Sequence, residues 1–226
     1  MKTVFVLVLA TFSLHAAALN VEIRISGAVE FNQINQGELA GANGGDDAEI
    51  VFQVSADTFI DSGNFPVRGY EVIAGSFQFT AGDNSVGLAD PFPAGQAPYF
   101  VIRNNDPAVD GFFLGTNVDG FPNGVPSDSE GLFGAFAPNF SVSYDNDPLP
   151  SLDILDALGT YDFAGLTSFN FVVNDGPFDA MGLIFDSMTI TAVPVPAAVW
   201  LMLGGLASLF GLKRKSRQRN LGVTSS

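Results

Sequence analysis

The sequence predicts an all-β fold, an antiparallel β-sandwich of about eight strands that is jelly-roll-like and covers residues 19–192. Three observations predict it. Apolar and polar residues alternate with period two in several segments, glycine-containing turn signals separate these segments, and 25 glycines and 13 prolines accompany only 15% charged residues. Alternation gives each strand one apolar and one polar face, so two sheets packed through their apolar faces would bury both.

The predicted strands follow one another along the chain. They cover residues 21–26, 50–55, 73–80, 140–145, 168–174 and 183–192, with two less regular strands at 99–103 and 111–116. In the last strand the apolar parity changes between Phe185 and Met188, which predicts a β-bulge near Asp186 and Ser187. A helix of two turns is predicted only at residues 151–158, with Ser151 as its cap and the leucines on its inner side.

Phenylalanine is the main core residue of the prediction, because it suits strands and fills the space between sheets. Phenylalanines beside proline or glycine in loops are the candidates for exposure: Phe65, Phe92, Phe121 and Phe178. Six phenylalanines in the alternating segments are expected to point inward: Phe52, Phe77, Phe79, Phe140, Phe169 and Phe171.

The first 18 residues are typical of a secretory signal peptide. Lys2 gives a charged start, an apolar stretch covers residues 4–14, and the segment closes with three alanines at 16–18. A first transmembrane helix is the alternative, although this apolar stretch is short for a bilayer. We therefore expect the body to be exported.

A second apolar segment lies at residues 193–212 and carries no charge. Twenty residues at about 1.5 Å per residue match the hydrocarbon thickness of a bilayer, which predicts a C-terminal transmembrane helix. A basic cluster follows, and cationic flanks stay on the cytoplasmic side. The cluster consists of Lys213, Arg214, Lys215, Arg217 and Arg219.

A short proline motif opens the apolar segment and consists of Val193, Pro194, Val195, Pro196 and Ala197. With this motif, the apolar span and the basic cluster, the tail resembles the PEP-CTERM class of sorting signals, and its VPLPA-CTERM variant in particular. Val195 stands where the variant has leucine, and the chain lacks the glutamate of the PEP form. The resemblance covers only the C-terminal tail.

The resemblance implies a sorting route. It implies that the tail is a substrate of an exosortase and is cut near the proline motif. Exosortases are membrane enzymes of Gram-negative bacteria, and these bacteria also make exopolysaccharide. The resemblance also implies a sorting signal at residues 193–219, a cytoplasmic end at 220–226, transient anchoring in the inner membrane, and a final place at the cell surface or outside the cell. A permanent C-terminal anchor is the alternative.

Charge and composition exclude several functions. All 24 carboxylates lie between Glu22 and Asp186, against three arginines, so the body has a formal net charge of −21 and should repel nucleic acid. The chain has no cysteine, and its one histidine, His15, lies in the segment expected to be removed. Catalysis by a Ser-His-Asp triad or a Cys-His pair, and histidine-bound metals, are therefore excluded.

No cofactor is expected, with calcium as the one open candidate, because hard cations favour carboxylate oxygens in loops. None of the acidic clusters has EF-hand spacing, and aspartate is also an ordinary turn residue. Asp106 and Asp110 form one such cluster. The residues singled out as calcium candidates are Asp46, Asp47, Asp145 and Asp147.

The sequence thus predicts a non-enzymatic, exported surface or matrix protein that is structural or associated with exopolysaccharide or biofilm. A carbohydrate-binding or calcium-binding module is the alternative, followed by a glycoside hydrolase that works through two carboxylates. An enzyme should show a cleft with a perturbed carboxylate, whereas a carbohydrate binder should show exposed aromatic side chains on a sheet face or a loop end.

Overall fold

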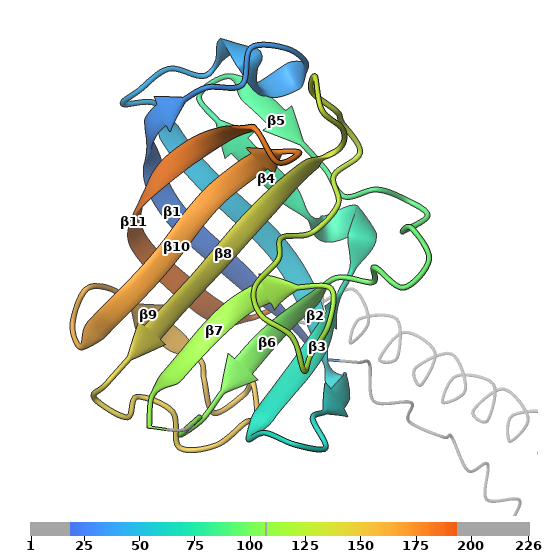
Figure 1. Ribbon diagram of the computed structural model, residues 1–226. Coiled ribbons are helices and arrows are strands. Elements are labelled where there is room, and N and C mark those ends of the chain that lie inside the picture. The colour runs from blue at the N-terminus through green and yellow to red at the C-terminus, as the bar shows by residue number, and fades with distance from the viewer. Residues whose placement is uncertain (1–18, 107, 194–226) are drawn as a thin grey trace, which may run out of the picture.

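The body of the chain is built from antiparallel strands that join in one continuous sheet (Figure 1). The computed structural model describes residues 19–106 and 108–193. Two short 3-10 helices, η1 (Glu38–Gly41) and η2 (Ala74–Ser76), interrupt the strands. The eleven strands are β1 (Asn20–Asn32), β2 (Asp47–Asp61), β3 (Val67–Val72), β4 (Gln78–Ala81), β5 (Asn84–Val86), β6 (Tyr99–Arg103), β7 (Asp110–Gly115), β8 (Phe136–Tyr144), β9 (Gly159–Tyr161), β10 (Leu166–Asp175) and β11 (Asp179–Ala192).

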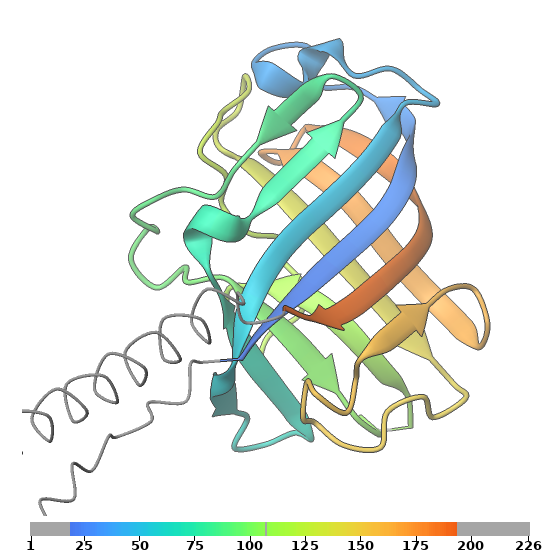
Figure 2. The ribbon, with the colours of Figure 1, turned by 180° about the vertical axis from the view of Figure 1, so that it is seen from behind.

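The sheet closes on itself. β1 pairs with β11 on one side and with β2 on the other, so the order β1-β11-β10-β8-β7-β6-β3-β2 returns to β1. Strands β4 and β5 extend the sheet beside β2, and β9 pairs with β11. Figures 1 and 2 show β10, β8 and β7 on one side of the molecule and β1, β2 and β4 on the other.

The predicted all-β, antiparallel class is confirmed. The described part of the chain has eleven strands instead of the predicted eight or so, and the two apolar faces belong to opposite walls of one sheet. The long strands β1, β2 and β11 have 13, 15 and 14 residues and contain irregular pairings. Because bulges bend and twist a strand, these irregular pairings help the long strands to follow the curvature of the closed sheet.

The predicted bulge in the last strand is confirmed. Ser26 of β1 lies opposite Ser187 of β11, but the next residue, Gly27, lies opposite Phe185, so Asp186 is the extra residue. Both Phe185 and Met188 are fully buried on either side of it. The bulge therefore keeps one inward face along the whole of β11, as the change of parity required.

Five of the six phenylalanines predicted to point inward are buried in the main core. Phe169 is the exception, since it is 44% exposed. It has the inward parity of Phe171, but β10 pairs with β11 only at residues 172–175. Phe169 therefore lies beyond the paired part of β10 and β11, where its ring contacts Phe185 of β11 with centroids 6.2 Å apart but stays partly open to solvent. Phe65, Phe121 and Phe178 are exposed, as predicted for loops.

The predicted strand 73–80 is wrong in its first half. β3 ends at Val72 and η2 turns the chain before β4 begins. Ser76 stabilises this turn, because its hydroxyl donates to the carbonyl of Ile73 at 2.6 Å and accepts the Gln53 N–H at 2.8 Å. β2 therefore pairs with two short strands, β3 and β4, along the edge where one continuous strand was predicted to begin.

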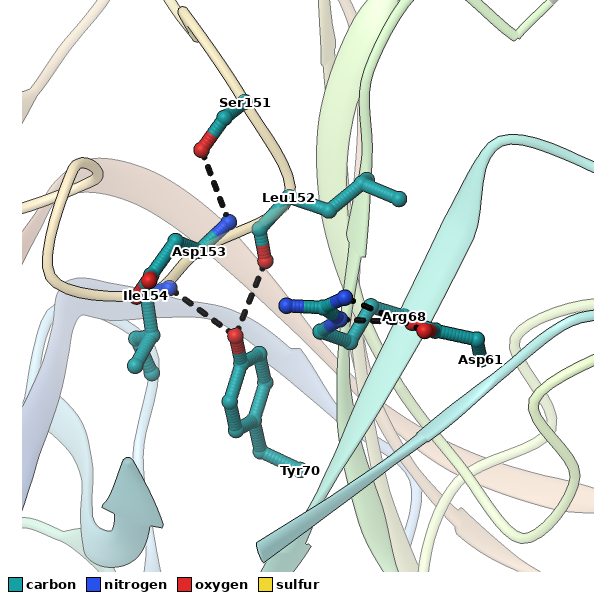
Figure 3. A network of polar contacts seen from close by, with 7 residues as sticks. All are labelled: Asp61, Arg68, Tyr70, Ser151, Leu152, Asp153 and Ile154. Atoms are coloured by element: carbon teal, nitrogen blue, oxygen red, sulfur yellow. Dashed lines mark hydrogen bonds and ion pairs between the residues drawn. The ribbon is translucent and has the colours of Figure 1, made fainter. Parts of the chain in front are cut away.

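The predicted helix at 151–158 is also wrong, because this segment forms turns. Tyr70 of β3 explains the difference (Figure 3). Its buried hydroxyl accepts the Ile154 N–H at 3.0 Å and donates to the Leu152 carbonyl at 2.9 Å, so a side chain replaces helical backbone bonds. Ile154 and Ala157 are buried instead of the predicted leucines.

Buried tyrosines make the fold sensitive to alkali. Burial raises the pKa of Tyr161 to about 12 and raises the pKa of Tyr70 and Tyr144. An unfolded tyrosine ionises near pH 10, so these groups leave stability unchanged below about pH 10 and reduce it as the pH rises toward 12. The urea midpoint should therefore fall above about pH 10, together with the rise of tyrosinate absorbance. A constant midpoint across this range would contradict the burial of these hydroxyls.

Candidate functional site

The two ends of the body lie side by side. Val21 of β1 pairs with Ala192 of β11, and the Val193 N–H donates to the Asn20 carbonyl at 2.8 Å. β1 and β11 thus start and finish at one end of the molecule, as Figures 1 and 2 show. The other ends of these strands, with η1 and the β10–β11 turn, lie at the opposite end of the body, called the distal end below.

Most of the predicted targeting residues lie outside the described residues. Val193 is the only member of the sorting motif that the structure describes. Pro194, Val195, Pro196 and Ala197, the basic cluster and the signal peptide at 1–18 lie outside. Within residues 19–106 and 108–193, no helix has the length and apolar character needed to cross a membrane.

The four calcium candidates form two separate pairs. Asp46 and Asp47 lie at the distal start of β2, whereas Asp145 and Asp147 follow the opposite end of β8. Asp46 Oδ2 accepts the backbone N–H of Asn43 at 2.8 Å, which is a turn contact. Among the described residues, no three acidic or histidine side chains are grouped so that they could hold a metal ion.

Two buried carboxylates act as loop anchors. Asp110 accepts the N–H groups of Asn105 and Leu149 at 2.9 and 2.7 Å. Asp175 accepts those of Leu132 and Phe133 at 2.8 and 2.9 Å. In the sequence Asp110 belongs to an acidic cluster with Asp106, and nothing local distinguishes either Asp110 or Asp175 from the other carboxylates.

Asp175 supports an exposed apolar tip at the distal end. The turn 131–134 closes through a bond from the Gly131 N–H to the Gly134 carbonyl at 2.9 Å and presents Leu132 and Phe133 to solvent. Phe133 contacts Phe178 of the β10–β11 turn edge to face, with ring centroids 5.1 Å apart. We call Leu132, Phe133 and Phe178 the distal tip.

An acidic groove of about 640 Å³ crosses the outer side of β1, β2, β4 and β11. Asp47, Glu49 and Asp186 line it together with Phe163 and Ile184. Glu49 accepts a hydrogen bond from Arg24 at the edge of this groove. Carboxylate acceptors beside apolar side chains suit ligands that are rich in hydroxyl groups or positively charged.

A second, smaller pocket lies on the outer side of β3, β6 and β7 and has a volume of about 210 Å³. Val67, Phe113 and Val118 line it, and with Val101 they form a separate apolar cluster outside the main core. Arg103 lines it, and the acidic side chains of Asp106 and Asp119 also do so. This pocket combines one cation with aromatic walls, unlike the acidic groove.

Comparisons with known proteins add no relative. No protein-family model matches the chain, and no curated protein or solved structure matches it.

Proposed function

We propose that this chain is a non-enzymatic, exported cell-surface or extracellular-matrix protein of a Gram-negative bacterium, structural or associated with exopolysaccharide. Its tail would be sorted by an exosortase-like membrane enzyme after transient anchoring in the inner membrane. The body carries a net charge of −21, which opposes binding to nucleic acid. The same charge keeps copies of the body apart in solution.

The adjacent ends of the body carry the proposal. β11 is complete at Ala192, and the last described backbone bond is the one from Val193 to Asn20. A cut beyond Val193 would therefore leave all eleven strands and their pairings intact. Before the cut, an anchor attached at this end would leave the distal end free to face away from the membrane.

The proline motif is expected to control release. Proline favours an extended backbone, which a protease needs, and replacing both Pro194 and Pro196 by alanine removes that preference. The double variant should remain at full length in the inner membrane of the native host. The wild-type body should appear outside the cell, lighter by the mass of its tail, as measured by fractionation and intact mass.

Pro93 provides a matched control, because it is an exposed proline in the loop before β6. The Pro93→Ala variant should be released like the wild type. If the wild type is found only as a full-length membrane protein in its native host, the tail is a permanent anchor and the sorting proposal is wrong.

Exposed aromatic side chains favour a carbohydrate-binding module as the second candidate function. Phe178 of the distal tip is 73% exposed, and Phe121 beside the small pocket is 91% exposed. Phe178 contacts Phe133 at the distal tip, and Phe121 lines the small pocket together with Asp106 and Asp119. A calcium-binding module and a glycoside hydrolase have no comparable observation among the described residues.

A further inference from the structure

Arg103 differs from the other two arginines of the body. Arg24 forms salt bridges with Glu49 and Glu22. Arg68 forms a bidentate salt bridge with Asp61, in which its Nε and Nη2 donate to the two carboxylate oxygens at 2.6 and 3.0 Å. Within residues 19–106 and 108–193, no carboxylate lies within ion-pair distance of Arg103. In a body with 24 carboxylates, one arginine is thus left without an anionic partner.

The guanidinium of Arg103 is held in place but is only partly satisfied. Its Nη2 donates to Ser143 Oγ at 2.6 Å, whereas its Nε is buried and has no acceptor among the described residues. Burial lowers the pKa of Arg103, although arginine stays charged in proteins. Arg103 is partly buried, and an anionic ligand in the pocket would offset the cost of removing this cation from water.

Gly111 makes room for this arrangement. Arg103, Gly111 and Ser143 are neighbours across β6, β7 and β8. A Cβ atom on Gly111 would collide with the Val142 carbonyl oxygen and would lie 2.9 Å from Arg103 Nη2, so glycine lets the guanidinium lie over β7 beside Ser143. The Phe113 ring centroid lies 5.7 Å from the guanidinium carbon and adds a cation–π contact. Arg103 is therefore positioned before any ligand arrives.

The rest of the pocket indicates the kind of ligand. Phe65 and Phe121 form aromatic walls, and Asp106 and Asp119 bring carboxylate oxygens that accept hydrogen bonds from hydroxyl groups. A volume of about 210 Å³ is smaller than the roughly 300 Å³ at which pockets for drug-sized ligands begin, so it suits a single ring. The two acidic side chains disfavour ligands with several negative charges.

We propose that this pocket binds a single sugar acid with one negative charge, with its carboxylate on Arg103, its ring between Phe65 and Phe121, and its hydroxyls on Asp106 and Asp119. A guanidinium matches a carboxylate with two parallel hydrogen bonds. The inference rests on the second candidate function, the carbohydrate-binding module. It assigns that function a site and a class of ligand.

Calorimetric titration of the full-length protein in detergent with sodium glucuronate tests the proposal. Glucuronate should bind in the millimolar range, and glucose should bind at least about tenfold more weakly, because a charged hydrogen-bonded pair is worth that factor. Arg103→Gln should weaken glucuronate binding by about tenfold or more. Arg103→Lys keeps the charge without the planar fork and should give an intermediate affinity.

Two further variants separate binding from folding. Phe121→Ala changes a side chain that is 91% exposed, so it should leave the unfolding midpoint unchanged and still weaken glucuronate binding. Arg68→Gln removes an arginine that is already paired with Asp61 and should leave the affinity unchanged. Equal affinities for glucuronate and glucose, or an unchanged affinity in Arg103→Gln, would overturn the proposal.

Competing anions define the remaining outcomes. If sulfate binds as tightly as glucuronate does, the pocket is a general anion site. If an acidic peptide binds more tightly than glucuronate does, the pocket is a peptide site. Either result overturns the sugar-acid assignment. Failure here is distinguishable from failure of the sorting proposal, because release from the cell is measured by mass. A released wild type that does not bind glucuronate refutes only the pocket, whereas a binding but unreleased wild type refutes only the sorting.

Discussion

Replacing Phe140 by alanine is expected to lower the free energy of unfolding by about 3 to 5 kcal/mol. Phe140 is fully buried in β8, and its ring packs against Phe171 and Phe185 with centroids 5.7 Å away in both cases. Alanine would leave a cavity between two walls of the closed sheet, and the neighbouring strands cannot collapse into it without breaking their pairing. Urea unfolding followed by fluorescence or circular dichroism measures the loss.

Phe169→Ala is the matched control, because the same residue type is removed from the strand that pairs with β8. Its ring is 44% exposed, so the expected loss is well below that of Phe140→Ala. Equal losses in the two variants would contradict the packing described for β10. They would indicate that β10 pairs with β11 further along its length than residues 172–175.

Replacing Asp175 by alanine is expected to lower the free energy of unfolding by about 2 to 4 kcal/mol. The side chain is fully buried and accepts the backbone N–H groups of Leu132 and Phe133. Its removal leaves two donors without acceptors, and each unsatisfied buried group costs about 1 to 3 kcal/mol. Urea unfolding gives the size of the effect, and faster hydrogen exchange at Leu132 and Phe133 locates it.

Asp57→Ala controls for the change of charge, because Asp57 is an exposed carboxylate in β2. It removes one negative charge from the same acidic body and should shift the urea midpoint only slightly. Asp175→Asn keeps one acceptor oxygen and should give a smaller loss than alanine. If Asp175→Ala unfolds at the same urea concentration as Asp57→Ala, Asp175 does not anchor the distal tip.

The candidate pocket shows how far local sequence can identify a site. The three arginines of the body are visible in the sequence, but nothing near them states which one lacks a partner. Arg103 donates a hydrogen bond to Ser143, which is 40 residues away in the chain, and it crosses Gly111 of β7 to do so. Such juxtapositions depend on strand pairing between distant segments. The same reason explains why the anchor role of Asp175, 42 residues from Phe133, had no local signal.

The sequence by itself determined the all-β class, most strands and the bulge at Asp186, because alternation with period two is a local consequence of having one buried face. It also determined the charge of the body. The tertiary structure decided how the sheet closes, since β1 must pair with both β11 and β2. In the tertiary structure residues 151–158 form turns, because the Tyr70 hydroxyl bonds to their backbone. Phe169 is partly exposed, because it lies beyond the paired part of β10 and β11. These outcomes depend on contacts between distant segments, which no periodicity records.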